Sequence, residues 1–140
     1  MGNKTFAIIK PDAVEKAYTG KIYDRIQKAG FNILSAKLLK MTVVQAEGFY
    51  SIHKDKPFFK DLIAFMTSGP CMVLALKKDN AVASWRKTIG ATNPQDAAEN
   101  TIRRDFATSV QENAVHGSDS DENAEKEIAF FFTDSELLSN

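Results

Sequence analysis

The segment KTFAIIK, residues 4–10, decides how the fold of this chain begins, because it places a short apolar run between charged residues. Four consecutive apolar residues with such flanks are typical of a buried β-strand. Pro11, which follows directly, has no backbone N–H with which to continue a ladder. Lys10 is therefore predicted to stand at the carboxyl end of a strand. Further along the chain, residues 31–39 and the apolar run 71–76 are predicted to form two more strands.

Apolar spacing and capping residues predict helices between and after these strands. The helices run from roughly residue 19 to 29, 42 to 53, 57 to 68, 80 to 89 and 121 to 131. Thr42 with Gln45 forms a capping box. Asn80 and Ser120 are candidate N-caps for the later helices. Strands that alternate with helices are typical of a parallel sheet, and the pattern alone predicts one.

Length and composition predict one domain, residues 1–140. Of these 140 residues, 44% are hydrophobic, which suffices for a single buried core.

The 18 basic residues balance 18 acidic ones, and the net charge of 0 argues against nucleic acid as the main partner. Cys71 is the only cysteine, which excludes an internal disulfide and favours a reducing compartment, the cytoplasm. The longest apolar run, 71–76, is far shorter than the ~20 residues that span a bilayer, so no membrane partner is expected.

The chemistry expected of the chain centres on His116, in the segment NAVHGSD, residues 113–119. The chain contains neither a P-loop nor a dinucleotide-binding glycine motif, so phosphate must be handled by side chains. A neutral imidazole attacks phosphorus well near neutral pH, because one ring nitrogen keeps a lone pair while the other holds a proton. Glu127 is a candidate to accept a hydrogen bond from that N–H group. Gly117 is expected to form a turn, because glycine adopts backbone conformations that other residues cannot.

Phosphoryl transfer also needs positive charge around the phosphate oxygens. Lys10, Arg86 and Arg103 are the candidates, since lysine offers a mobile point charge and arginine a planar fork for two oxygens. Residues 91–113, which include Arg103, lack clear periodicity, and a long ordered loop of this kind is usually functional. His53, the second histidine, is expected to be structural or peripheral.

Four blocks and a tail segment, in order along the chain, resemble the nucleoside diphosphate kinase family and its shorter, bacterial-type members. They are IIKPDAV (8–14), GATNP (90–94), TIR (101–103), NAVHGSD (113–119) and NAEKEIA (123–129). One departure is Arg104, which stands in TIRRDF where the family has glycine. We expect Arg104 to point to solvent or to a neighbouring carboxylate and to leave Arg103 as the phosphate ligand.

The resemblance implies an α/β (α+β) fold of the ferredoxin-like type. In place of a parallel sheet, this fold has a four-stranded antiparallel sheet with helices packed on one face. The implied activity is a ping-pong transfer of the γ-phosphate of a nucleoside triphosphate, typically ATP, to a nucleoside diphosphate. A pros-phosphohistidine on His116 would be the intermediate. Broad acceptance of base and sugar, Mg²⁺ as cofactor, and a tetrameric or hexameric homo-oligomer are further implications.

The resemblance also assigns roles to individual residues. Glu127 and Ser118 would orient the His116 ring, and Tyr50 would support Lys10. The implied nucleotide-binding residues are Lys10, Phe58, Leu62, Arg86, Thr92, Arg103, Val110 and Asn113. Phe58 would stack on the base. Mg²⁺ would be carried on the substrate phosphates, with Asp119 in contact through water.

Two other functions stay open at this point. One is a nucleotide- or nucleic-acid-binding module without catalysis, and the other is a phosphohistidine carrier that receives its phosphate from a protein. A carrier would be phosphorylated only in the presence of a partner enzyme. A kinase would label itself from ATP alone and pass the label to a nucleoside diphosphate.

Overall fold

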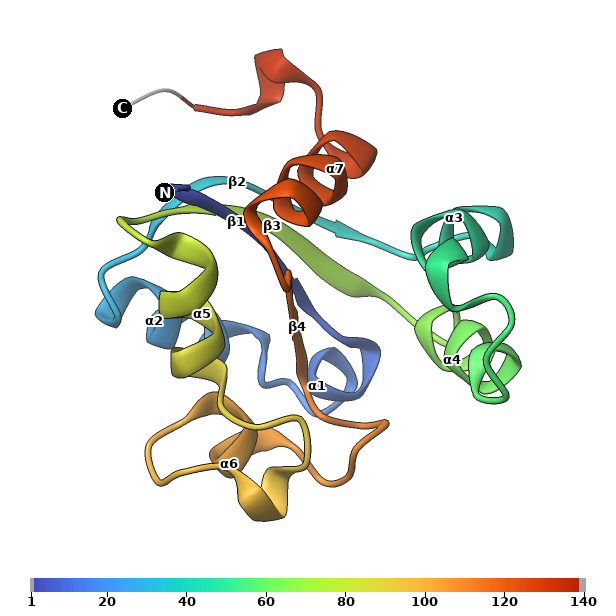
Figure 1. The fold of residues 1–140 in the computed structure, drawn as a ribbon. Helices are drawn as coiled ribbons and strands as arrows, with labels where there is room; N and C mark the ends of the chain where they lie inside the picture. The colour runs from blue at the N-terminus through green and yellow to red at the C-terminus, as the bar shows by residue number, and fades with distance from the viewer. Residues whose placement is uncertain (1, 139–140) are drawn as a thin grey trace.

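A four-stranded sheet forms the centre of the computed structural model, which describes residues 2–138 (Figure 1). Its strands lie in the order β2-β3-β1-β4. Their bounds are β1 (Lys4–Ile9), β2 (Asn32–Leu39), β3 (Cys71–Lys77) and β4 (Val115–Gly117). β1 pairs with β3 and β4, and β2 pairs with β3, each time antiparallel. The single-domain antiparallel sheet implied by the resemblance is thus confirmed. The ends of the predicted domain, Met1 and Asn140, lie outside the described residues.

The parallel sheet predicted from the pattern is wrong, and the reason lies in the strand order. β1 and β2 do run in the same direction, because each is antiparallel to β3. The helices between them, α1 (Pro11–Glu15) and α2 (Thr19–Lys28), make the long crossover that two parallel strands need. β3, which comes much later in the chain, then lies between β1 and β2. An alternation of strands and helices does not reveal such an insertion.

Helices cover both faces of the sheet, whereas the resemblance implied one. α2 and α5 (Ala81–Ile89) lie on one face, and α7 (Asp121–Phe131) lies on the other (Figure 1). α3 (Val43–Phe49) and α4 (Phe59–Met66) add apolar side chains to the core on the α7 side. α6 (Ile102–Phe106) lies in the long segment after α5. Within residues 2–138, every helix is too short or too polar to cross a membrane.

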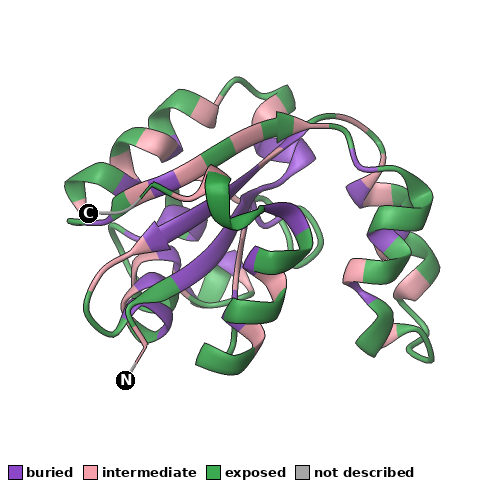
Figure 2. Ribbon diagram, turned by 90° about the horizontal axis from the view of Figure 1, so that it is seen from above, coloured by how far each residue is buried: buried purple, intermediate pink, exposed green. Residues whose placement is uncertain are grey.

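The two hydrophobic clusters of the core divide along β1, because neighbouring side chains of a strand point to opposite faces. Phe6 and Ile8 belong to the cluster beneath α7, where the Phe6 ring stacks on Phe131 with 5.5 Å between centroids. Ala7 and Ile9 belong to the cluster beneath α2 and α5. β1 is therefore buried on both faces, as the purple central strands of Figure 2 show, and this explains its continuous apolar run.

The helix predicted over residues 42–53 is divided in the structure. Its capping box is confirmed, since the N–H of Gln45 donates to Thr42 Oγ1 at 3.0 Å and the Gln45 side chain accepts from the Thr42 N–H. α3 ends at Phe49, however, and a separate 3-10 helix covers Ser51–His53. The capping box is a local signal, so the sequence shows where the helix begins, but it did not show where the helix ends.

The two predicted N-caps behave differently. Ser120 caps α7, because its hydroxyl accepts the N–H of Asn123 at 3.1 Å. Asn80 precedes α5 as predicted but does not cap it. Its backbone is left-handed, with φ of 52°, and its side chain makes no capping hydrogen bond. Asparagine tolerates this conformation better than most residues, and this tolerance, in place of capping, explains asparagine at position 80.

β4 is the strand that the sequence pattern did not indicate. It has only three residues, and one of them, Gly117, is a residue type that is depleted in strands. The turn expected at Gly117 is wrong, because the backbone of this glycine is not left-handed. A Cβ at position 117 would instead lie 2.8 Å from Cδ1 of the fully buried Trp85. Glycine is needed here for space.

We expect Gly117→Ala to destabilise the fold by about 1–3 kcal/mol, the usual cost of overpacking a core. Urea unfolding followed by circular dichroism measures this loss. Gly20→Ala is the matched control, because a Cβ at position 20 of α2 meets no atom within 4 Å, and alanine favours a helix over glycine. Equal destabilisation by the two substitutions would show that the contact with Trp85 is not the reason for glycine.

Candidate active site

β4 places the His116 ring at the edge of the sheet, on the face covered by α7. His116 pairs with Ile8, which belongs to the cluster beneath that helix. The imidazole centroid lies 5.7 Å from the Phe49 ring and 6.1 Å from the Phe6 ring. From the other face, Trp85 Nε1 donates to the His116 carbonyl at 3.1 Å. Because 20% of its side chain is exposed, the imidazole is both packed and reachable from solvent.

Glu127 of α7 and Ser118 orient the imidazole. His116 Nε2 lies 2.9 Å from Glu127 Oε1, and the buried Ser118 hydroxyl donates to the same oxygen at 2.7 Å. A carboxylate beside Nε2 favours the tautomer that carries its proton on that nitrogen. Nδ1, which has no hydrogen-bond partner within residues 2–138, then keeps its lone pair. A nucleophilic imidazole requires this arrangement.

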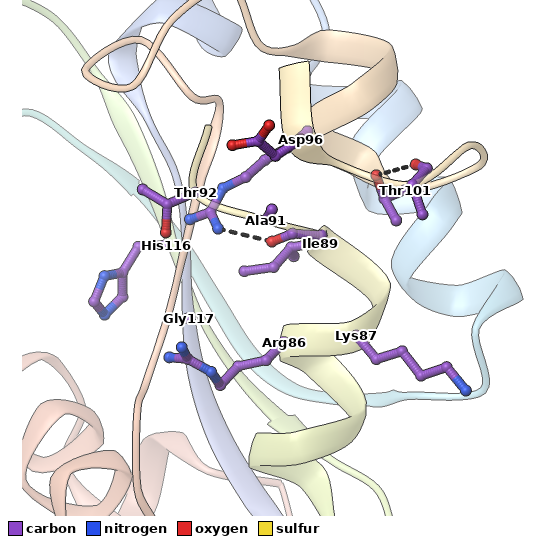
Figure 3. A pocket seen from close by; sticks show the side chains of 12 residues that line it. Arg86, Lys87, Ile89, Ala91, Thr92, Asp96, Thr101, His116 and Gly117 are labelled. Carbon is purple, nitrogen blue, oxygen red and sulfur yellow. Dashed lines mark hydrogen bonds between the residues drawn. The ribbon is translucent and has the colours of Figure 1, made fainter. Parts of the chain in front are cut away.

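A cleft of ≈ 560 Å³ opens beside the ring. Four predicted site residues line it: Arg86, Thr92, Arg103 and His116. In Figure 3 the Arg86 guanidinium, the Thr92 side chain and the His116 ring lie around one space, whereas Lys87, which also lines the cleft, extends away from the ring. Two guanidinium groups, a hydroxyl and an imidazole suit an anion that carries several oxygens.

Arg103 is held by backbone carbonyls from two other segments. Its Nη1 donates to the Gly90 carbonyl at 3.0 Å, and its Nη2 donates to the Val115 carbonyl at 2.9 Å. Burial, and then the charge of Arg86, lower the pKa of Arg103 to about 10. Its Nε is buried without a hydrogen-bond partner in the described part of the chain. The guanidinium is thus rigid and electrostatically unsatisfied, as an anion-binding group should be.

Hydrogen bonds connect Lys10, Asn113 and the Thr92 backbone. Lys10 Nζ donates to Asn113 Oδ1 at 2.9 Å, and Asn113 Nδ2 donates to the Thr92 carbonyl at 3.3 Å. Burial, and then the charge of Arg103, lower the pKa of Lys10 to about 8, while the charge of Asp12 opposes the shift. Asp12 was not among the predicted site residues, although it lies in the block IIKPDAV, two positions after Lys10.

The predicted base-binding residues lie outside this cleft. Phe58 directly precedes α4, is 48% exposed and lies 5.6 Å from the His53 ring between centroids. Leu62 packs against the core cluster beneath α7. Val110 is exposed in the segment between α6 and β4. Phe58 and Val110 therefore present apolar surface to solvent.

Tyr50 makes no hydrogen bond to Lys10 in the described part of the chain, and its implied support of Lys10 stays a prediction. Its hydroxyl is buried and has no hydrogen-bond partner within residues 2–138. Burial raises the pKa of Tyr50 far above its usual value, and the neighbouring Cys71 and Glu127 raise it further. The phenol therefore stays neutral and contributes no charge to the site.

Asp119 is an exposed carboxylate at the start of the segment that leads into α7. Its Oδ1 accepts from Asn123 Nδ2 at 2.6 Å, and this hydrogen bond lowers the pKa of Asp119. The charge of Arg86 lowers that pKa as well. No group of three or more His, Cys, Asp or Glu side chains placed to hold a metal ion occurs among the described residues. Asp119 is an ionised carboxylate that could contact a metal ion from one side.

Arg104 is exposed, as predicted, but it contacts carbonyl groups and not a carboxylate. Its Nη1 donates to the carbonyls of Gln95 and Ala97, each at 3.4 Å. Its backbone belongs to α6 and is not left-handed, so glycine is not required at this position. Arg103 lines the cleft beside His116, and Arg104 does not.

Comparison with known proteins agrees with these features. Residues 3–137 match the family model described as Nucleoside diphosphate kinase. A nucleoside diphosphate kinase of Legionella pneumophila is 59% identical over 135 residues, 96% of each chain. The solved nucleoside diphosphate kinase of Aquifex aeolicus has a TM-score of 0.95 at 41% identity and covers 97% of this chain and 99% of its own. A halophilic nucleoside diphosphate kinase from Halobacterium salinarum, solved in complex with CDP, has a TM-score of 0.94 at 37% identity, with coverage of 100% and 93%. The match of residues 3–137 and the similarity to these proteins over nearly the whole length show that the chain belongs to the nucleoside diphosphate kinase family.

Proposed function

We propose that this nucleoside diphosphate kinase transfers its phosphoryl group through His116 in a ping-pong sequence. The Nδ1 lone pair attacks the γ-phosphorus of a nucleoside triphosphate, and the bond from phosphorus to the β–γ bridging oxygen breaks as the Nδ1–P bond forms. The nucleoside diphosphate leaves, and a second one takes the phosphoryl group by the reverse steps. The hydrogen bond between Nε2 and Glu127 carries this proposal, because it leaves Nδ1 free to form the pros-phosphohistidine.

Glu127 contributes charge as well as orientation. Bond formation at Nδ1 makes the ring cationic while Nε2 still holds its proton, so no proton has to leave the imidazole. A carboxylate oxygen 2.9 Å from Nε2 stabilises this cation. Ser118 holds the same oxygen in place. The stabilising charge is in position before the reaction begins and needs no rearrangement.

The cations of the cleft would bind the phosphate oxygens. Arg86, Arg103 and the Thr92 hydroxyl share the cleft with His116, and we assign them to the transferred and adjacent phosphates. Burial, and then repulsion by the charge of Arg86, disfavour the charge of Arg103 in the free protein. An anion placed between the two guanidinium groups relieves that repulsion, which favours phosphate binding.

Lys10 and Asn113 would bind the sugar hydroxyl and a phosphate, and Phe58 would stack on the base with Leu62 and Val110 nearby. Stacking is worth about 1–3 kcal/mol per base, and every base has a π-face, so such a slot accepts many bases. The exposure of Phe58 and Val110 supports this assignment. The halophilic relative was solved with CDP, a pyrimidine nucleotide, which is consistent with broad acceptance.

Members of this family use a divalent metal, and we propose Mg²⁺ carried on the substrate phosphates. Mg²⁺ keeps several of its waters in protein sites. Asp119, an exposed carboxylate with a lowered pKa, fits a contact through one of those waters. When bound, the ion would neutralise charge on the phosphate oxygens.

We also propose that the chain, as one domain over residues 1–140, assembles into a tetrameric or hexameric homo-oligomer in the cytoplasm. β2 lies at the edge of the sheet and exposes Leu38, which is 61% accessible. An exposed edge strand is a template for pairing with another chain. The buried, unpaired Cys71 thiol suits a reducing compartment.

His116→Ala is expected to abolish covalent labelling by radioactive ATP with Mg²⁺. In the wild type, the label should be acid-labile and base-stable, and it should move to an added nucleoside diphosphate. His53→Ala is the control and should keep the label. A label that forms only with a partner enzyme would identify a phosphohistidine carrier. No label on the wild type would identify a binding module.

Arg103→Ala should weaken the binding of a nucleoside diphosphate roughly tenfold or more, because a charge-assisted hydrogen bond is lost. Arg104→Ala is the matched comparison and should change the affinity less than about twofold, since its side chain lies outside the cleft. Isothermal titration calorimetry measures both affinities, and thermal unfolding shows that both variants are folded. A larger loss from Arg104→Ala would reverse the assignment.

The affinity of the wild type for a nucleoside diphosphate should fall as the pH rises through about 8, because Lys10 has a pKa of about 8 and loses its charge there. An ordinary lysine would keep its charge to about pH 10. Calorimetric titrations over roughly pH 7 to 9.5 measure this decline. Lys10→Ala should bind more weakly at neutral pH without the decline. A decline that persists in Lys10→Ala belongs to another group.

A further inference from the structure

The residue that joins Asn113 to β4 has an unfavourable backbone conformation. Ala114 is fully buried and has φ of 71°, in the left-handed region that disfavours residues with a Cβ. Asn113, on its amino side, binds Lys10 Nζ, and His116 follows two positions after Ala114. Whatever holds the Ala114 backbone therefore sets the relative positions of the lysine, the amide and the imidazole.

The segment that contains Lys10 and Asp12 holds Ala114 from both sides. Asp12 Oδ2 accepts the N–H of Ala114 at 3.1 Å, a buried hydrogen bond across 102 residues of chain. The N–H of Lys10 donates to the Ala114 carbonyl at 2.8 Å. Asp12 is 3% exposed, and its Oδ1 has no hydrogen-bond partner in the described part of the chain. The Ala114 hydrogen bond is thus the contact that links this carboxylate to the strand of His116.

We propose that Asp12 is a positioning residue for phosphoryl transfer, whose carboxylate holds the Ala114 peptide so that Lys10, Asn113 and His116 face one substrate. This inference rests on the proposed role of His116. Asp12 itself does not line the cleft. It acts through the backbone that carries the other groups.

The charge of Asp12 supports the same role. Lys10 faces two charged groups, Arg103 of α6 and Asp12 of α1. Arg103 and burial lower the pKa of Lys10, and Asp12 raises it. Burial raises the pKa of Asp12 in turn, whereas the N–H of Ala114 and the charge of Lys10 lower it. A buried carboxylate is costly unless it is compensated, and here its charge favours the charged form of Lys10.

The test compares Asp12→Ala with Asp12→Asn by the single-turnover rate at which ATP with Mg²⁺ labels the full chain. At about pH 6.5, where Lys10 is protonated in the wild type, Asp12→Ala removes the acceptor and should slow labelling roughly 10- to 100-fold. Asp12→Asn keeps an acceptor oxygen and should stay within about threefold of the wild type. Equal losses in the two variants, or no loss in either, would overturn the proposal.

A second measurement does not depend on Asp12→Ala being folded. The labelling rate of the wild type should decline above about pH 8 as Lys10 loses its proton. In Asp12→Asn this decline should begin at a lower pH, because the amide no longer opposes the lowering of the Lys10 pKa. A merely structural role would leave the position of the decline unchanged, and an unshifted decline in Asp12→Asn would overturn the proposal.

Asp121→Ala is the matched control. Asp121 Oδ2 also accepts a backbone N–H from a distant segment, that of Gly2 at 2.9 Å, but this hydrogen bond lies on the exposed surface. This variant should label at the wild-type rate. The two proposals fail in distinguishable ways. Label that survives in His116→Ala contradicts the proposed function, whereas label that is lost there but unaffected by either Asp12 variant contradicts only the role of Asp12.

Discussion

The register of β4 against β1 is the constraint on which the site depends. Opposite Ile8, the His116 side chain points toward α7 and Glu127, whereas Val115 and Gly117 face the cluster that contains Trp85. A slip of one residue would exchange these faces, because side chains alternate along a strand. Two contacts of Trp85 oppose such a slip. Its ring packs against Gly117, where a side chain would not fit, and its Nε1 donates to the His116 carbonyl. Core packing thus determines where the imidazole points.

The position of β4 at the edge of the sheet explains how a packed imidazole stays reachable. β1 and β3 have neighbouring strands on both sides, and helices cover both faces, so most of their residues are buried. β4 has a neighbour on one side only, and the cleft opens on the other. α5 and α6 pack near this edge (Figure 1), and they bring Arg86 and Arg103 to the ring. The same edge that ends the sheet therefore provides room for an anion.

Two cations of the site carry their charge at a cost in the free protein. Burial, and then the charge of Arg103, lower the pKa of Lys10, and burial, and then the charge of Arg86, lower the pKa of Arg103. Their geometry is nevertheless fixed by hydrogen bonds to Asn113 and to backbone carbonyls. Donors that are already held in place need no rearrangement to meet an entering anion, which is the physical meaning of preorganisation in the proposed mechanism. Asp12 is the acidic group that limits the cost at Lys10.

The sequence by itself determined the features that depend on residues a few positions apart: the apolar strand segments, the caps at Thr42 and Ser120, and the motifs that contain Lys10, Arg103 and His116. The tertiary structure alone decided the strand order, the two covered faces, the strand at His116 and the contact of Asp12 with Ala114. Each of these depends on pairing or burial between distant segments, as in the hydrogen bond that joins Asp12 to Ala114 across 102 residues. Periodicity and capping report a residue's neighbours in the chain, and they carry no information about such contacts. Glycine at position 117 shows the difference, since its local reading is a turn and its actual reason is the ring of Trp85.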